Sequence, residues 1–130
     1  MQAAITLERA DPLSPEAAAL IAARDAEYRA LYPPGEEKAA SGADLADAGA
    51  RFFLARADGQ AVGCAGFVPT PDHAEIKSLY VLPERRGTGL GRRLLAAIEA
   101  AARAEGHRLL KLETGTESAE ARGLYAAAGY

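Results

Sequence analysis

The sequence of 130 residues lacks tryptophan and contains one cysteine, Cys64, and two histidines, His73 and His107. A single cysteine cannot form an internal disulfide, and with only two histidines no thiolate and imidazole zinc site can be assembled. A site built from carboxylates alone has no support in the sequence, so we expect no metal. Cys64 lies among small residues of an apolar segment, which favours a core residue over a nucleophile.

Long hydrophobic runs are also missing. No apolar segment approaches the roughly 20 residues that span a bilayer, and the first residues do not resemble a signal peptide. We therefore expect a cytoplasmic protein with no membrane partner. A composition of 49% hydrophobic and 25% charged residues is typical of one globular domain, spanning residues 1–130.

The formal net charge of -3 is too small to indicate a partner, but the basic residues are unevenly distributed. Between residues 82 and 111, seven basic residues stand against three acidic ones, which favours an anionic ligand. Nucleic acid is disfavoured because the whole chain is acidic and no aromatic residues alternate with the basic ones as a stacking platform would need. A phosphorylated small molecule fits better.

Hydrophobic periodicity and turn residues predict the order β-α-α-β-β-β-α-β-α, with Ser14 as the N-cap of the first helix and Asp58-Gly59 as a hairpin turn. Three consecutive strands joined by hairpins exclude a doubly wound sheet, and the flanking helices indicate an α+β or mixed α/β sheet. The expected strands are residues 3–9, 51–56, 61–68, 74–81 and 108–113, and the expected helices run from Pro15 to just before Pro33, over 43–48, over 90–104, and from about 116 to about 128.

The segment from Val81 to Arg93 joins a strand to the most clearly amphipathic helix. Gly87, Gly89 and Gly91 allow a tight turn whose N–H groups point one way, and the helix start adds roughly half a positive charge. The segment therefore predicts a diphosphate-binding loop. A plain turn that needs positive φ is the alternative, but it does not explain the four flanking arginines. A Walker loop would need Gly-Lys-Ser/Thr, and a Rossmann fingerprint would need glycine where Arg92 stands.

Two motifs resemble a known family. The segment Arg86-Gly-Thr-Gly89-Leu-Gly91 is similar to the Arg/Gln-x-x-Gly-x-Gly/Ala signature of the GNAT superfamily of acyl-CoA N-acyltransferases. In that superfamily the signature lies between the fourth strand and the third helix, which is also the expected position of this segment. The segment Leu124-Tyr125-Ala-Ala-Ala-Gly129-Tyr130 resembles the family's later Leu-Tyr-x-x-x-Gly-Phe/Tyr segment. The resemblance implies an acyl-CoA N-acyltransferase-like fold, with a mixed, mostly antiparallel sheet flanked by helices.

The resemblance also implies an enzyme that transfers an acetyl or short acyl group from acetyl-CoA to a primary amine of an unidentified small molecule or protein. The backbone of residues 86–92 would hold the CoA pyrophosphate, and the edge of the preceding strand would pair with the pantetheine arm. Ser118 stands where relatives commonly have asparagine. The implied cofactor-binding residues are Leu79, Tyr80, Val81, Arg86, Gly87, Thr88, Gly89, Leu90, Gly91, Arg92 and Ser118.

Two residues are candidates for catalysis. Tyr125 falls on the family tyrosine proposed to protonate the departing CoA thiolate, and its alternative role is that of a half-buried helix aromatic. Glu75 stands where many relatives keep a carboxylate that takes the ammonium proton, but it could equally pair with Lys77 on the same strand face. Glu113 is a second candidate for the base or for binding a cationic substrate, and Tyr32 is a weak candidate for substrate binding.

The end of the sequence departs from the family. The family continues past the Gly-Tyr pair with one or two more strands, whereas this sequence stops at Tyr130. We expect either a shortened form or a homodimer in which a partner chain supplies the strand, because the fifth strand would otherwise leave an unprotected sheet edge. A non-catalytic module for CoA binding or dimerisation on the same fold is the alternative function.

Overall fold

The computed structural model describes residues 4–31 and 40–112. In chain order its elements are β1 (Ile5–Arg9), α1 (Pro15–Leu31), α2 (Gly42–Asp47), β2 (Arg51–Ala57), β3 (Gln60–Pro69), β4 (Ala74–Val81), the 3-10 turn η1 (Pro83–Arg85), α3 (Leu90–Ala104) and β5 (Leu110–Leu112). This order confirms the predicted succession up to the fifth strand. The predicted last helix lies outside the described residues. The predicted start of the last strand, residue 108, is two residues too early, because only residues from Leu110 onward pair with β4.

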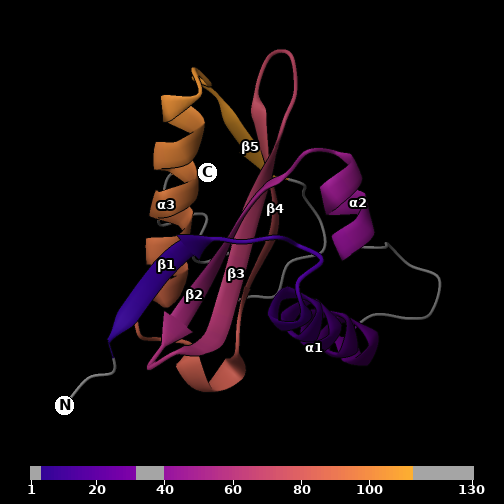
Figure 1. Ribbon diagram of the computed structural model, residues 1–130, viewed down its shortest axis with the longest axis vertical. Helices are drawn as coiled ribbons and strands as arrows, with labels where there is room; N and C mark the ends of the chain where they lie inside the picture. Colours follow the sequence, from indigo (N-terminus) through magenta and orange to yellow (C-terminus); the bar gives the residue numbers. More distant parts are fainter. Residues whose placement is uncertain (1–3, 32–39, 113–130) are drawn as a thin grey trace.

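The described strands form one sheet in the order β1-β2-β3-β4-β5, in which the first three pairings are antiparallel and β4 pairs with β5 in parallel (Figure 1). Asp58 and Gly59 have φ values of 50° and 83°, so they form the two-residue turn that Asp-Gly predicts between β2 and β3. The parallel β5 needs a crossover, which α3 provides. The predicted mixed, mostly antiparallel sheet is confirmed.

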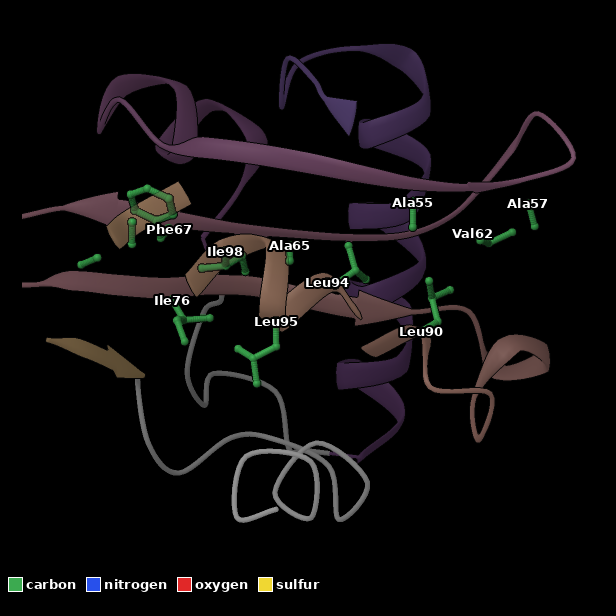
Figure 2. Packing of buried hydrophobic residues seen from close by; sticks show 12 residues of the cluster. Ala55, Ala57, Val62, Ala65, Phe67, Ile76, Leu90, Leu94, Leu95 and Ile98 are labelled. Atoms are coloured by element: carbon green, nitrogen blue, oxygen red, sulfur yellow. The ribbon is translucent and has the colours of Figure 1, made fainter. Parts of the chain in front are cut away.

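Helices cover both faces of the sheet (Figure 1). On one face, Leu90, Leu94, Leu95 and Ile98 of α3 pack into a buried cluster with strand residues such as Phe67 (Figure 2). On the other face, α1 and α2 pack against β2, β3 and β4, and the buried cluster there consists of Ala17, Leu20, Ile21, Leu45, Phe52, Leu54, Cys64 and Tyr80. The side chains of β2 alternate between the two clusters, which explains why its apolar residues form a continuous run.

Local sequence determines where the helices on the second face begin. The Ser14 Oγ accepts a hydrogen bond of 3.3 Å from the amide of Ala17, which is the N-cap contact expected from the sequence. At the start of α2, Ser41 and Asp44 exchange side-chain to backbone hydrogen bonds of 3.0 Å each and form a capping box. These caps fix the starts of the two helices whose buried cluster includes Tyr80 of β4, where the candidate site begins.

Neither α1 nor any other helix in the described ranges is both long and apolar enough to cross a membrane. A single domain over residues 1–130 stays a prediction.

Candidate functional site

The glycine-rich loop lies between η1 and the first turn of α3. Gly87 and Gly89 have φ values of 79° and 85°, a left-handed conformation that glycine adopts without strain. Both are exposed, and a Cβ atom added at either position would meet nothing within 4 Å. The space above these two glycines is therefore open to a ligand.

The amide N–H groups of this loop are available. Among the described residues, none accepts a backbone hydrogen bond from the amides of residues 87–92, whereas the preceding amides of Arg85 and Arg86 donate to Leu82 and Pro83. The N-cap of α3 is Gly89, which offers no side chain to its first turn. A 15-residue helix thus begins with donors that have no acceptor within residues 4–31 and 40–112, and with the positive end of its dipole, which is a suitable arrangement for phosphate oxygens.

The side chain of Arg86 is already engaged. Its Nε donates to the Val81 carbonyl at 3.0 Å, and its Nη2 lies 2.9 Å from each carboxylate oxygen of Glu27 on α1. Its guanidinium carbon lies 5.6 Å from the centre of the Tyr80 ring, which is a cation–π distance. Arg86 therefore holds the loop against α1 and the end of β4, a role that the signature alone did not indicate.

Tyr80 completes this contact. Its hydroxyl donates to Glu27 at 3.2 Å, and its side chain is buried against α1. Burial and then the negative charge of Glu27 raise the pKa of Tyr80 above its ordinary value. The hydroxyl therefore remains a proton donor to Glu27 at neutral pH.

An irregularity interrupts β4 at Ser78. The register against β3 passes from Gly66–Lys77 to Cys64–Tyr80, so two residues of β4 oppose one of β3, and Ser78 has a φ of 58°. Such a bulge changes which face the following side chains occupy. Ile76 and Tyr80 would share a face in a regular strand, but Ile76 packs with α3 and Tyr80 with α1. The sequence predicted an uninterrupted strand over residues 74–81, in which side chains alternate between the two faces, and it gave no indication of this bulge.

The far edge of β4 is only partly paired. β5 pairs with residues Ala74, Glu75 and Ile76, and no described strand pairs with Leu79, Tyr80 or Val81 on that side. The opposite edge of Tyr80 and Val81 pairs with β3. The three residues predicted to contact pantetheine thus form an edge that ends beside the glycine-rich loop.

The side chain of Arg24 on α1 contacts the bulge at Ser78. It is only 4% exposed, and its Nη1 donates to the Ser78 Oγ at 2.6 Å while Nη2 donates to the Ala40 carbonyl at 2.7 Å. Asp25 supplies its carboxylate partner. Sequence reasoning missed Arg24, Glu27 and Ser78 as site residues. The one available indication was that Arg24 recurs on the apolar face of α1 with Leu20, which is unusual for an exposed charge.

Glu75 lies on β4 before the bulge. Its Oε1 is 3.3 Å from the Lys77 Nζ and its Oε2 is 4.0 Å from the His73 Nε2. The pairing considered as an alternative from the sequence is therefore present, and it leaves the Glu75 side chain 30% exposed. The other residues predicted for catalysis or substrate binding, Tyr125, Tyr32 and Glu113, lie outside the described residues, and so does Ser118, which was predicted to bind the cofactor.

Cys64 is a core residue, as predicted. It is 1% exposed, its Sγ contacts the Ser78 carbonyl at 3.5 Å, and burial raises the pKa of its thiol to about 12. A protonated, enclosed thiol is a poor nucleophile. Within the described ranges, no group of three or more His, Cys, Asp or Glu residues is arranged to hold a metal ion.

Comparisons with known proteins agree with this geometry. The acetyltransferase (GNAT) family model matches residues 17–130. The IAA acetyltransferase of Azospirillum brasilense is 36% identical over 128 residues, which cover 97% of this chain and 84% of that protein. A crystal structure from Klebsiella pneumoniae subsp. pneumoniae, described as an acyl-CoA N-acyltransferase, has a TM-score of 0.79 and 34% identity over 97% of this chain and 82% of that chain.

A GNAT family acetyltransferase from Elizabethkingia anophelis, solved with acetyl-CoA bound, has a TM-score of 0.70 and 23% identity, covering 96% of this chain and 74% of that chain. At this identity the likeness shows the fold alone. The family match itself spans most of the sequence and includes the glycine-rich loop. The predicted family and the predicted class of enzyme, an N-acetyltransferase, are confirmed: the chain belongs to the GNAT family of acyl-CoA N-acyltransferases.

Proposed function

We propose that the protein transfers the acetyl group of acetyl-CoA to a primary amine of a small molecule or a protein. The observation that carries the proposal is the row of amide N–H groups at residues 87–92 for which no described residue provides an acceptor, beside the edge of β4 that no described strand pairs. The identity of the amine is left open.

The loop fits a diphosphate. Its amides can donate to phosphate oxygens that approach closely over Gly87 and Gly89, where no side chain intervenes. Arg85 and Arg92 flank these amides, and no acidic side chain of the described ranges pairs with either of them. Their charges are therefore available to a ligand, unlike that of Arg86.

The edge of β4 fits the pantetheine arm. Pantetheine carries amide groups, and an unpaired strand edge recognises such groups by the hydrogen bonds of strand addition. Leu79, Tyr80 and Val81 would form this contact, and Thr88, Leu90 and Gly91 would complete the loop contacts. Ser118 is proposed to contact the cofactor as well.

Acetyl-CoA would supply a thioester, and the neutral amine would attack its carbonyl carbon directly. Before the attack, the substrate ammonium would give one proton to Glu75, directly or through water. The attack would form the C–N bond of a tetrahedral intermediate, whose nitrogen would give a second proton to water. Collapse of the intermediate would break the C–S bond, while Tyr125 would give a proton to the departing thiolate and regain one from water. Glu75 is already held by Lys77, which would orient its carboxylate. Glu113 and Tyr32 are proposed to contact the amine.

The proposal is tested by calorimetric titration with acetyl-CoA and by measuring CoA release with a panel of primary amines. We expect binding, a rise in melting temperature that grows with acetyl-CoA concentration, and CoA release with some amines. A folded chain whose melting temperature is unchanged by millimolar acetyl-CoA would exclude the proposal. Binding without CoA release for any amine would instead indicate a non-catalytic CoA-binding module.

A further inference from the structure

Glu27 of α1 is far from the glycine-rich loop in sequence but contacts it in space. Its carboxylate binds the Arg86 Nη2 with both oxygens at 2.9 Å, and it accepts the Tyr80 hydroxyl at 3.2 Å. We propose that Glu27 is a positioning residue for acetyl-CoA, which holds the pyrophosphate loop in its binding conformation through Arg86. This inference rests on the proposed function and adds a residue to it.

The loop has few other restraints. Gly87, Thr88 and Gly89 are exposed, and no packing partner lies within 4 Å of where a Cβ of either glycine would be. Among the residues that the structure describes, the Thr88 hydroxyl donates only to the nearby Arg85 carbonyl. Two left-handed glycines separated by one residue and without packing would sample many conformations. The Gly89 carbonyl accepts the Arg93 amide of α3 at 3.1 Å, and within the described part of the chain the Arg86 side chain is the contact that ties this segment to α1.

The anchor itself is rigid. Glu27 follows Leu20 and Arg24 on the same face of α1, at positions i, i+4 and i+7. Leu20 and Arg24 are 3% and 4% exposed, so this face of the helix is fixed against the sheet. Glu27 therefore presents its carboxylate from a fixed element, and the Val81 carbonyl and the Tyr80 ring hold the guanidinium from two further directions.

The charge of Arg86 is neutralised by this contact. A guanidinium with a carboxylate on Nη2 and a carbonyl on Nε attracts a phosphate less than a free one does. Its contribution to acetyl-CoA affinity is then indirect, because it raises the fraction of molecules in which the amides of residues 87–92 converge. If loss of Glu27 lowers that fraction to about one tenth, the apparent Kd rises about 10-fold.

The test compares Glu27→Gln with a matched control, Glu16→Gln. Glu16 also lies on α1 and also pairs with an arginine of the sheet, Arg56, but at the opposite end of the helix. We expect Glu27→Gln to raise the Kd and KM for acetyl-CoA about 10-fold, with kcat at saturating acetyl-CoA changed by less than about 2-fold. Glu16→Gln should leave all three unchanged.

A double-mutant cycle tests whether the effect runs through Arg86. We expect Arg86→Gln to raise the Kd by a similar factor, and the double variant to bind no worse than the weaker single variant. Independent, multiplying effects would overturn the proposal, and so would a Glu27→Gln protein that binds acetyl-CoA as tightly as wild type. If Glu27→Gln does not fold, Arg86→Gln tests the proposal, since it removes the same ion pair by changing the other partner. An Arg86→Gln protein that binds acetyl-CoA as tightly as wild type would then overturn the proposal.

A measurement on the ligand-free protein separates this inference from the proposed function. The 15N relaxation of Gly87 and Gly89 should show lower order parameters in Glu27→Gln than in wild type and in Glu16→Gln. If wild type does not bind acetyl-CoA, the proposed function fails, but lower order parameters would still show that Glu27 orders the loop. Unchanged order parameters would overturn the inference whether or not acetyl-CoA binds.

Discussion

Arg24 donates a hydrogen bond of 2.6 Å from Nη1 to the Ser78 Oγ, and this contact joins α1 to the bulge of β4. The same guanidinium reaches the Ala40 carbonyl just before α2. One buried cation thus fixes three chain segments around the point where β4 changes its side-chain alternation. Because Tyr80 faces α1 only beyond this bulge, the contact between Tyr80 and Glu27 depends on it.

Replacing Arg24 should therefore destabilise the fold. Arg24→Leu leaves the Ser78 hydroxyl and the Ala40 carbonyl without their donor, and we expect a loss of roughly 1–3 kcal/mol in the free energy of unfolding, measured in urea. The control is Arg51→Leu, which removes a partly exposed pair with Glu105 and should cost less than about 1 kcal/mol. Equal losses would show that the buried contacts of Arg24 contribute no more than a surface pair.

Substitution of Gly89 should abolish acetyl-CoA binding. Gly89→Asp places a side chain and a negative charge where the diphosphate must approach. Gly59→Asp is a matched control, since Gly59 has a φ of 83° and equally open surroundings but lies in the β2–β3 turn. We expect each variant to lose roughly 1–2 kcal/mol of stability, and only Gly89→Asp to lose binding by calorimetry. Arg86→Ala should weaken binding less. Retained affinity in Gly89→Asp would show that the glycine serves only the turn.

Tyr125→Phe tests the proposed acid. If the Tyr125 hydroxyl protonates the thiolate, its removal should lower kcat by about 10- to 10⁴-fold with little change in the Kd of acetyl-CoA, because the hydroxyl acts mainly in the transition state. Steady-state rates and calorimetry measure the two quantities separately. An unaltered kcat would remove Tyr125 from the mechanism.

Glu75→Gln tests the proposed base. The rate should fall most below the pKa of the amine and recover partly above it, where neutral amine is already present. Lys77→Met is the control, because it removes the ion pair but keeps the carboxylate, and its pH profile should retain the wild-type shape. A Glu75→Gln defect that is the same at every pH would assign Glu75 to substrate binding or structure instead.

Cys64 should make the protein less stable at alkaline pH. Burial raises the pKa of its thiol from the ordinary 9.0 to about 12, so the unfolded chain releases this proton first. Below pH 9 the thiol contributes no pH dependence, whereas between pH 9 and about pH 12 it lowers the free energy of unfolding by up to about 1.4 kcal/mol per pH unit. Cys64→Ala should show a shallower decline in this range in chemical unfolding. If the free energy of unfolding falls equally with pH in the two proteins, the raised pKa of the Cys64 thiol would be contradicted.

Much of the fold could be predicted from local patterns. The Asp58-Gly59 turn, the cap at Ser14 and the amphipathic α3 each depend on residues a few positions apart, and each was found where it was expected. The glycine-rich loop was recognisable for the same reason, because its conformation and its donors come from consecutive residues. Leu95 is buried beside Leu94 in the same cluster, so the apolar stripe of α3 is wide.

The sequence by itself thus determined the order of elements, the loop that begins α3 and the family. Only the tertiary structure decided that Arg86 is held by Glu27 and that Arg24 supports Ser78, because these partners are 59 and 54 residues apart. It also decided that the side chain of Tyr80 faces α1, since the bulge at Ser78 reverses the expected alternation. Contacts between distant segments leave no periodic trace in the sequence, because they arise only when sheet register and helix packing bring the side chains together.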